Sequence, residues 1–308
     1  MISIIIPTLN RQKLLEKSIK AILNNTEKPD EIIIIEQWNI EKTKEILKNI
    51  NFNFKIYFLD EKSASKARNF WVKKSSWSIL LFIDDDLQID KDYIKKAYDY
   101  LKENESVKIV SWRDKNAFIP KINFFKKMIR VLTYQDIFWN KRIVLKNGQN
   151  IVRLNFDKIV DSQWASGTMI VKKEVFEFFS FPWNFERWSF WEDVFFSYQV
   201  FKKYWEWSIK FIPDLIFNHI KSNQNRITTG SEIKMMIIYR YIFWKTCLYN
   251  NSYLNLFFYI YWEFFRWLYI WKTKKWNLKI VFNTWKYLFK NYKKINNNTI
   301  KYNDFILK

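Results

Sequence analysis

Short runs of apolar residues alternate with helical patterns over the first part of the chain, and this alternation constrains the fold more than any other feature. The run ISIII at 2–6 leads through Pro7 to Asn10, a residue suited to cap a helix, and then to leucines and isoleucines at helical spacing. Further strands and helices are expected at 31–36, 40–50, 54–59, 63–75, 78–83 and 90–103. Strands that are apolar throughout and alternate with helices form a mostly parallel sheet covered by helices on both faces. We therefore expect an α/β fold whose ligands bind beyond the carboxyl ends of the strands.

The second part of the chain has a less regular pattern. The elements expected there are a strand at 107–111, a loop-rich segment at 113–160, a short strand followed by a helix within 164–179, a helix at 192–204, and two strands, SIKFI and LIFNHI, within 208–220. From about residue 231 the chain changes to long, aromatic and basic helices. We therefore predict an α/β domain at 1–225 and a helical region at 226–308.

Charge and cysteine content narrow the class of protein. A composition of 49% hydrophobic and 27% charged residues is that of a globular protein, and the net charge of +21 favours polyanionic partners such as anionic lipid headgroups or a phosphorylated substrate. No nucleic-acid-binding signature accompanies the lysines, so nucleic acid is not expected as a partner. Cys247 is the single cysteine, which excludes an internal disulfide and fits a reducing compartment. The N-terminus has no basic region before its short apolar run, and we expect a cytoplasmic protein.

The helical region contains a long aromatic stretch at 253–271. Its Glu263 and Arg266 make it a poor membrane-spanning helix. A basic, aromatic amphipathic helix suits the interface of an anionic membrane, which would place the protein peripherally on the inner face of the cytoplasmic membrane. Packing on the α/β domain or in a dimer accounts for the same stretch equally well.

The chain has 3 glycines and 17 tryptophans. At an average glycine usage of roughly 7%, a chain of this length would carry about 22 glycines. The abundance of Lys, Asn, Ile, Phe and Tyr reflects AT-rich codons, a bias that depletes glycine and tryptophan alike and cannot enrich one at the other's expense. We therefore hypothesise that UGA specifies glycine in the source genome and that the printed sequence reads these codons as tryptophan.

Three consecutive aspartates, Asp84 to Asp86, follow the apolar run at 78–83. Repulsion among three carboxylates raises the cost of ionising all of them, and a bound cation removes that cost. Magnesium and manganese prefer oxygen ligands and commonly bind through one or two carboxylates together with substrate phosphates. A solvated turn in which Asp85 or Asp86 caps a helix explains the same residues without a metal.

A second acidic pair, Glu192 and Asp193, opens the helix at 192–204. Carboxylates are favoured at helix N-termini in any protein, so the pair alone does not indicate catalysis. The order and spacing of several segments, however, resemble the family 2 glycosyltransferases of the GT-A fold, a Rossmann-like α/β fold. The similarity extends over roughly residues 1–220 and is carried by SIIIPTLNR (3–11), EIIIIEQ (31–37), SASKARNFW (63–71), WSILLFIDDD (77–86), ASGTMIVKKEVF (165–176), WEDVFFSYQV (191–200) and FIPDLIFNHI (211–220).

This resemblance implies an enzyme that moves a sugar from a nucleotide-diphosphate sugar to a glycan or lipid-linked acceptor hydroxyl with inversion, in surface polysaccharide or glycolipid synthesis. Asp193 matches the family's catalytic base, and Glu192 would orient the acceptor. The metal, Mn²⁺ or Mg²⁺, would be held by Asp86, Asp84 and His219. The residues implied in binding the nucleotide sugar are Pro7, Thr8, Asn10, Arg11, Glu36, Arg68, Asn69, Asp84 and Asp85. Glu36 stands where the family usually has an aspartate. The alternative is a non-catalytic module that binds nucleotide or phosphate in the same cleft and a membrane or polyanion through its basic tail.

The resemblance also indicates which tryptophans stand at positions where glycine is expected. Trp71, Trp77 and Trp191 stand where the family has glycine. Trp38 follows the second strand in a turn, and Trp205 falls at a helix end, where a left-handed cap favours glycine. Neither Trp164 nor Trp207 has a comparable claim.

Overall fold

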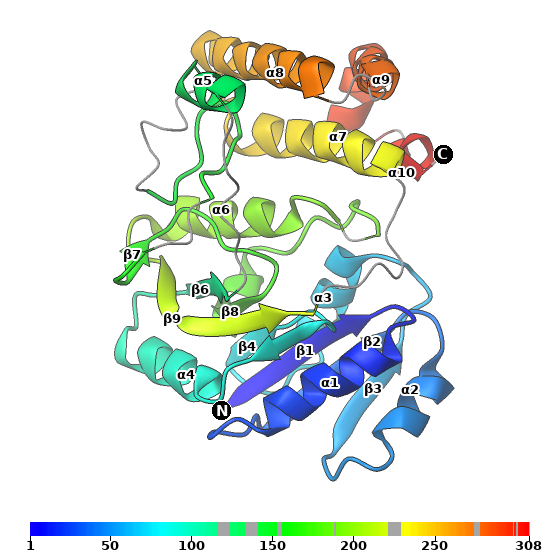
Figure 1. The fold of residues 1–308 in the computed structure, drawn as a ribbon, viewed down its shortest axis with the longest axis vertical. Helices are drawn as coiled ribbons and strands as arrows, with labels where there is room; N and C mark the ends of the chain where they lie inside the picture. Colours follow the sequence, from blue (N-terminus) through cyan, green and yellow to red (C-terminus); the bar gives the residue numbers. More distant parts are fainter. Residues whose placement is uncertain are drawn as a thin grey trace. The chain divides into compact units, whose positions relative to one another are not determined.

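A computed structural model of the chain describes residues 1–115, 124–132, 141–152, 156–187, 189–220, 229–273, 278–297, 299 and 301–307. The chain forms two compact units (Figure 1). Unit 1 comprises residues 1–118 and 154–226, and unit 2 comprises residues 119–153 and 227–308. Residues 119–153 thus group with the C-terminal helices, although no local pattern in the sequence indicates this grouping.

Unit 1 is built on a nine-stranded sheet in the order β3-β2-β1-β4-β8-β6-β9-β5, with β7 paired to β9. The strands are β1 (Ile2–Thr8), β2 (Glu31–Glu36), β3 (Phe54–Phe58), β4 (Ile79–Phe82), β5 (Leu87–Ile89), β6 (Ile109–Asp114), β7 (Val160–Asp161), β8 (Met169–Lys172) and β9 (Ile209–His219). From β3 to β4 every pairing is parallel, and β6 also pairs in parallel with β9. The β4–β8, β8–β6, β9–β5 and β9–β7 pairings are antiparallel. The predicted α/β class with a parallel core is confirmed.

Helices cover both faces of this sheet (Figure 1). The buried residues of α1 (Gln12–Leu23), α2 (Ile40–Leu47) and α4 (Tyr93–Glu103) join one apolar core, and those of α3 (Ala64–Val72) and α6 (Glu192–Tyr204) join the other. β1 and β2 contribute to both cores because the side chains of a strand alternate between its two faces. This explains why their sequences are apolar throughout.

Three sequence predictions in unit 1 need correction. The segments SIKFI and LIFNHI are one strand, β9, because Pro213 lies in an irregularity where the pairing moves from Ser111↔Phe211 to Arg113↔Ile216. Proline cannot donate to a ladder and is tolerated at such bulges. The helix expected after β8 is a short 3-10 turn, η1 (Lys173–Glu177). Asn10 does not cap α1, since Arg11 occupies the N-cap position and makes no side-chain capping bond.

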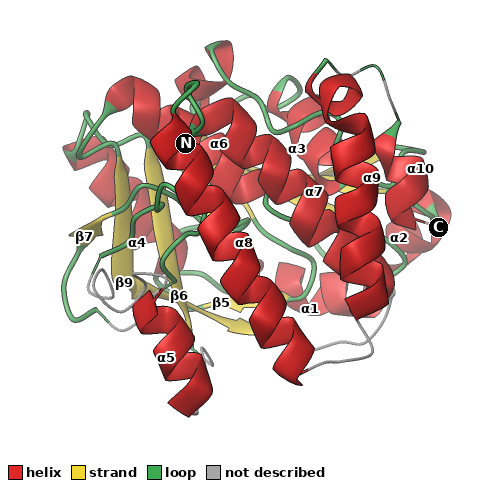
Figure 2. Cartoon of the chain, turned by 90° about the horizontal axis from the view of Figure 1, so that it is seen from above, coloured by secondary structure: helices red, strands yellow, loops and turns green. Residues whose placement is uncertain are grey.

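Unit 2 consists mainly of helices, drawn in red in Figure 2. They are α5 (Phe124–Leu132), α7 (Thr229–Cys247), α8 (Tyr253–Thr273), α9 (Leu278–Asn296) and α10 (Tyr302–Leu307). α7 packs on α9, and Trp244 of α7 stacks on Tyr259 of α8 with ring centroids 4.2 Å apart. Within the described residues, no helix is both long and apolar enough to cross a bilayer.

Three tryptophans of unit 1 have the positive φ angles that favour glycine. Trp191 has φ +77° and Trp207 has φ +80°. Trp205 has φ +60° with ψ −160°, a region that is essentially restricted to glycine. The angles at Trp191 and Trp205 support the recoding hypothesis, and the angle at Trp207 extends it to a position for which the sequence offered no argument. Trp71 lies in α3, and its indole is buried with no hydrogen-bond partner for its N–H, which is uncommon for a buried tryptophan.

Candidate active site

The acidic run lies in the turn between β4 and β5, at the carboxyl end of β4. Its middle residue, Asp85, is 4% exposed and turned toward the loop after β1. Thr8 Oγ1 donates to Asp85 Oδ2 at 2.6 Å, and Arg11 Nη1 lies 3.2 Å from Asp85 Oδ1. Burial raises the pKa of Asp85 to about 7, although Arg11 and the Thr8 hydroxyl act in the opposite direction. Asp85 therefore ties the acidic turn to the first strand-to-helix loop.

The third aspartate, Asp86, meets residues from two other elements. Arg11 Nη1 donates to Asp86 Oδ2 at 3.0 Å, and His219 Nε2 lies 3.2 Å from the same oxygen. The antiparallel β5–β9 pairing sets Leu87 opposite His219, and the Ile220 N–H donates to the Asp86 carbonyl oxygen at 2.8 Å. The hydrogen bond that His219 donates to Asp86 raises the pKa of His219. Backbone pairing thus brings together two residues that are far apart in the sequence.

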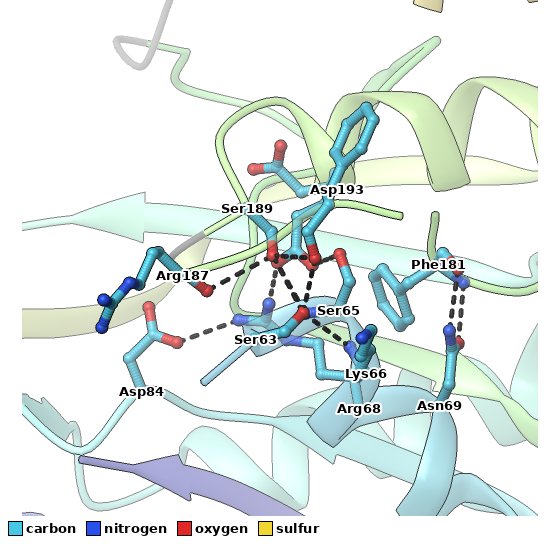
Figure 3. Close-up of polar contacts among 12 residues, drawn as sticks. Ser63, Ser65, Lys66, Arg68, Asn69, Asp84, Phe181, Arg187, Ser189 and Asp193 are labelled. Carbon is cyan, nitrogen blue, oxygen red and sulfur yellow. Dashed lines mark hydrogen bonds and ion pairs between the residues drawn. The ribbon is translucent and has the colours of Figure 1, made fainter. Parts of the chain in front are cut away.

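Arg68 of α3 connects the acidic turn to the start of α6 (Figure 3). Its Nη2 donates to Asp84 Oδ1 at 3.0 Å, and its Nη1 forms an ion pair with Glu192. Ser65 Oγ donates to the other oxygen of Glu192 at 2.6 Å. Arg68 and Glu192 are 3% and 4% exposed, so the pair is desolvated, whereas the Asp84 side chain is 47% exposed. Although Asp84 reaches solvent, the protein packed around its carboxyl group raises its pKa, an effect that Arg68 opposes.

Asp193 occupies the first turn of α6, beside Glu192. Its Oδ1 accepts from the Val194 N–H at 2.7 Å. A Cβ added at Gly167 would lie 3.3 Å from Arg68 Nη2 and 3.9 Å from Asp193 Oδ2, so this glycine lets the backbone pack closely against the guanidinium and the carboxylate. Burial raises the pKa of Asp193, opposed by the Val194 N–H and by Arg68. The arrangement gives a carboxylate of increased basicity next to a fixed cation.

Hydrogen bonds explain how the segment of Gly167 is held against α6. Ser197 Oγ donates to the Asp193 carbonyl oxygen at 2.6 Å and accepts from the Ala165 N–H at 2.9 Å. The loop before β8 is therefore fixed to the same helical turn that presents Asp193.

Glu36 and Asn69 bind other parts of the protein. Glu36 is fully buried, and its carboxylate accepts from the Trp38 N–H at 2.9 Å and from Thr43 Oγ1 at 2.5 Å, which holds the turn into α2. Asn69 forms two hydrogen bonds with the backbone of Phe181, of 2.7 and 2.8 Å. Both side chains, as they lie, shape the backbone around the site.

Pro7 and Asn10 lie where the chain leaves β1. Pro7 is opposite Ile35 in the parallel β1–β2 pairing, and Asn10 has φ +54°. In this structure, these two residues set the path of the loop that carries Arg11.

Sequence reasoning missed a serine cluster beneath the site (Figure 3). Ser63 caps α3 by accepting from the Lys66 N–H and donates to the Phe185 carbonyl oxygen at 2.6 Å, and Ser189 Oγ lies 3.5 Å from Ser63 Oγ. The Ala64 N–H donates to the Arg187 carbonyl oxygen at 2.8 Å. These bonds join α3 to the segment before α6. A serine followed by a helical pattern is a recognisable cap signal, but its partners at 185–189 had no signal in the sequence.

The acidic turn offers few protein ligands for a divalent cation. Within the described ranges, no group of three or more His, Cys, Asp or Glu side chains converges as a metal site. The Asp86 carboxylate and the His219 imidazole lie in contact and could both bind a cation. The Asp84 carboxylate is paired with Arg68 instead. A pair of ligands of this kind suffices where substrate phosphates complete the coordination.

Comparison with known proteins adds to this geometry. The model of the family described as "Glycosyl transferase family 2" matches residues 3–159, about half of the chain. The chain belongs to glycosyl transferase family 2. The predicted family is thereby confirmed. The matched range includes the acidic turn, α3 and the loop after β1 but ends before Asp193 and His219.

Curated relatives of this family 2 protein match it over limited lengths. It is 30% identical over 134 residues to the poly(ribitol-phosphate) β-N-acetylglucosaminyltransferase TarP of Staphylococcus aureus, covering 41% of each chain. It is 34% identical over 90 residues to the GalNAc(5)-diNAcBac-PP-undecaprenol β-1,3-glucosyltransferase of Campylobacter jejuni, covering 28% of this chain and 29% of the relative. The matches to the curated relatives span less than half of each relative's own length.

Solved structures share the fold. Residues 1–349 of S. aureus TarS in complex with UDP-GlcNAc match with a TM-score of 0.53 and 16% identity, covering 79% of this chain and 66% of that one. Glucosyl-3-phosphoglycerate synthase from Mycobacterium tuberculosis, in complex with Mn²⁺ and UDP, matches with a TM-score of 0.55 and 14% identity, covering 80% of each chain. At these identities the likeness confirms the α/β fold class.

Proposed function

We propose that this protein transfers a sugar from a nucleoside-diphosphate sugar to an acceptor hydroxyl, with inversion at the anomeric carbon and Asp193 as the general base. The observation that carries the proposal is the position of Asp193, in the first turn of α6 beside the buried pair of Glu192 and Arg68 and against Gly167, where an added Cβ would lie 3.9 Å from Asp193 Oδ2. Its raised pKa suits a base that must take a proton as the acceptor attacks.

The reaction is a single displacement. The acceptor oxygen forms a bond to the anomeric carbon, and the bond from that carbon to the diphosphate oxygen breaks with its electron pair leaving on the nucleotide. The proton of the acceptor hydroxyl passes to the Asp193 carboxylate. Attack from the side opposite the leaving group inverts the anomeric centre.

The donor would lie over the loop after β1 and the acidic turn. Arg11 and Arg68 supply guanidinium groups, which bind phosphate through paired hydrogen bonds. Glu192 and Ser65 hold Arg68 in place, so we assign Glu192 as a positioning residue in addition to the acceptor-side role that the resemblance implied. The similar structure of TarS was solved in complex with UDP-GlcNAc, which supports a UDP-sugar as the first donor to test.

A divalent cation, Mn²⁺ or Mg²⁺, would be held by Asp86 and His219, with Asp84 adjacent. When bound, it would neutralise the charge that develops on the departing diphosphate. Arg11 and His219 contact the same oxygen of Asp86, and Arg11 also contacts Asp85, so Asp85 would keep Arg11 at the acidic turn if the cation took Asp86.

We further propose that the acceptor is a glycan or lipid-linked saccharide of a surface polysaccharide or glycolipid, and that the reaction takes place in the cytoplasm, at the inner face of the membrane. The names of the relatives support this choice, since TarP and TarS are named for transfer to poly(ribitol-phosphate) and the C. jejuni enzyme is named for transfer to an undecaprenol-linked saccharide.

The test separates this proposal from the non-catalytic binding module. Donor hydrolysis and transfer are measured with UDP-sugars and Mn²⁺ for the wild type and Asp193→Asn, and donor binding is measured by calorimetry for both. We expect the variant to bind donor as the wild type does and to lose transfer. Binding without any turnover by the wild type would favour the non-catalytic module, and full activity in Asp193→Asn would remove Asp193 as the base.

A further inference from the structure

The positive charge of the chain is concentrated in unit 2. Residues 119–153 and 227–308 contain 22 lysines and arginines and 4 aspartates and glutamates, so they carry +18 of the net +21. Unit 1, which holds every residue of the candidate active site, carries the remaining +3. The charge is therefore concentrated outside the unit that holds the candidate active site.

The helix α8 exposes an apolar stripe. Its members recur every three or four residues, so they lie along one face of the helix. They are Tyr253 (85% exposed), Phe257 (60%), Ile260 (59%), Phe264 (55%) and Trp267 (40%). The opposite face is buried against the other helices of unit 2 through Tyr259 and Trp262. Four members of the stripe are not tryptophan, so the stripe persists if Trp267 is a recoded glycine.

Two neighbours of α8, drawn in Figure 2, also expose apolar side chains. α5 and α9 both contact α8. α5 exposes Phe124 and Met128, and α9 exposes Phe282 and Phe289. α9 also exposes five lysines, which are Lys279, Lys286, Lys290, Lys293 and Lys294. We call the exposed residues of α5, α8 and α9 the aromatic-basic surface.

The aromatic-basic surface has no carboxylate of its own. Glu263 is the single acidic residue in the sequences of α5, α8 and α9. It is 7% exposed, and its carboxylate forms ion pairs with Arg240 and Arg266, the latter at 2.6 Å. Its charge is therefore neutralised beneath the surface, and the charges that face solvent along these three helices are all positive.

We propose that the aromatic-basic surface binds the headgroup region of an anionic lipid bilayer, with α8 lying in the plane of the membrane. Apolar and aromatic side chains enter the boundary between headgroups and acyl chains, and the lysines of α9 meet the lipid phosphates. An anionic bilayer matches both the exposed apolar stripe and the positive charge of the surface. A symmetric dimer through α8 would bring the lysines of two copies together without carboxylates to pair them, and a nucleic acid would leave Ile260, at the centre of the stripe, uncovered.

The test is co-sedimentation of the full chain with vesicles of phosphatidylcholine alone and of phosphatidylcholine mixed with phosphatidylglycerol. We expect binding to the mixed vesicles and little to the neutral ones. Because each lysine near an anionic surface strengthens binding roughly fivefold, Lys286→Gln/Lys290→Gln should weaken binding about 30-fold. Phe257→Ser/Phe264→Ser should also release the protein from the vesicles, and since both residues are exposed, its thermal unfolding should match that of the wild type.

Matched controls come from unit 1. Ile159→Ser/Phe178→Ser changes two exposed apolar residues, and Lys17→Gln/Lys102→Gln changes two exposed lysines, all outside the aromatic-basic surface. Neither control should alter vesicle binding. Equal binding to neutral and anionic vesicles, no binding to either, or equal losses in the controls would overturn the proposal. A dimer that Phe257→Ser/Phe264→Ser dissociates, without vesicle binding by the wild type, would assign the surface to self-association instead. None of these measurements depends on sugar transfer.

Discussion

Replacing Trp205 by glycine should stabilise the protein, although removal of a large side chain normally does the opposite. The residue has φ +60° and ψ −160°, and a side chain held in this region costs about 1–3 kcal/mol. Glycine adopts the conformation without strain but loses roughly 0.5–1 kcal/mol more backbone entropy on folding. The Trp205 side chain is 72% exposed, so little buried area is lost. We expect a net gain of about 1–2 kcal/mol, which for a unit of this size raises Tm by about 2–8 °C.

The assay is thermal unfolding followed by circular dichroism, with two matched variants. Trp205→Ala removes the indole but keeps a Cβ, so it should not share the gain. Trp183→Gly removes a tryptophan that is 46% exposed and is not among the residues with positive φ, so it should lower Tm or leave it unchanged. The reasoning is refuted if Trp205→Gly lowers Tm as much as Trp183→Gly does, or if Trp205→Ala stabilises equally.

Four further predictions concern the gene and the active site. Sequencing the gene should find UGA at Trp71, Trp77 and Trp191, and UGG at these positions would reject the recoding hypothesis. Asp193→Asn should lower kcat by about 10²–10⁴-fold with little change in the KM for donor, measured by release of nucleoside diphosphate. Because burial raises the pKa of Asp193 and the base acts in its ionised form, kcat should fall as pH decreases, with a midpoint above that of an ordinary aspartate; a midpoint near 4 would contradict this. Glu192→Gln should cost about 3–5 kcal/mol in the free energy of unfolding, because it leaves the buried Arg68 without its main partner, and an unchanged Tm would show that the ion pair is not needed.

The fold could be predicted from the sequence where one physical signal dominates. The runs at 2–6 and 31–36 are apolar on both faces because both faces of β1 and β2 are covered, and this property is visible residue by residue. The same signal could not show β5, since three residues are too few to display a period, nor the continuity of β9 through Pro213. The grouping of residues 119–153 with the C-terminal helices depends on tertiary packing that no local pattern encodes.

The candidate site was predictable as a set of residue types and much less so as a set of contacts. The aspartates were identified because three carboxylates in a row after an apolar strand are costly to ionise, and Arg68 was identified because its segment resembles one of the family. Their pairings depend on which side chains the fold brings together. Asp85 turns inward to Thr8, and Glu36 turns away from solvent to hold its own turn, whereas the sequence gives both the same acidic character.

The pairing of β9 has a consequence for where this chain can tolerate insertions. Asp86 is followed at once by β5, and β5 pairs with β9 so that Leu87 lies opposite His219. Adding or deleting one residue near the end of β9 would shift this register, turn every following side chain to the other face of the sheet, and separate His219 from Asp86. Insertions in the connection between β6 and β7 leave that register intact. Differences in length among homologues should therefore occur between β6 and β7 and be absent from residues 215–219. The acceptor specificity of the site could then change while the distance between Asp86 and His219 stays the same.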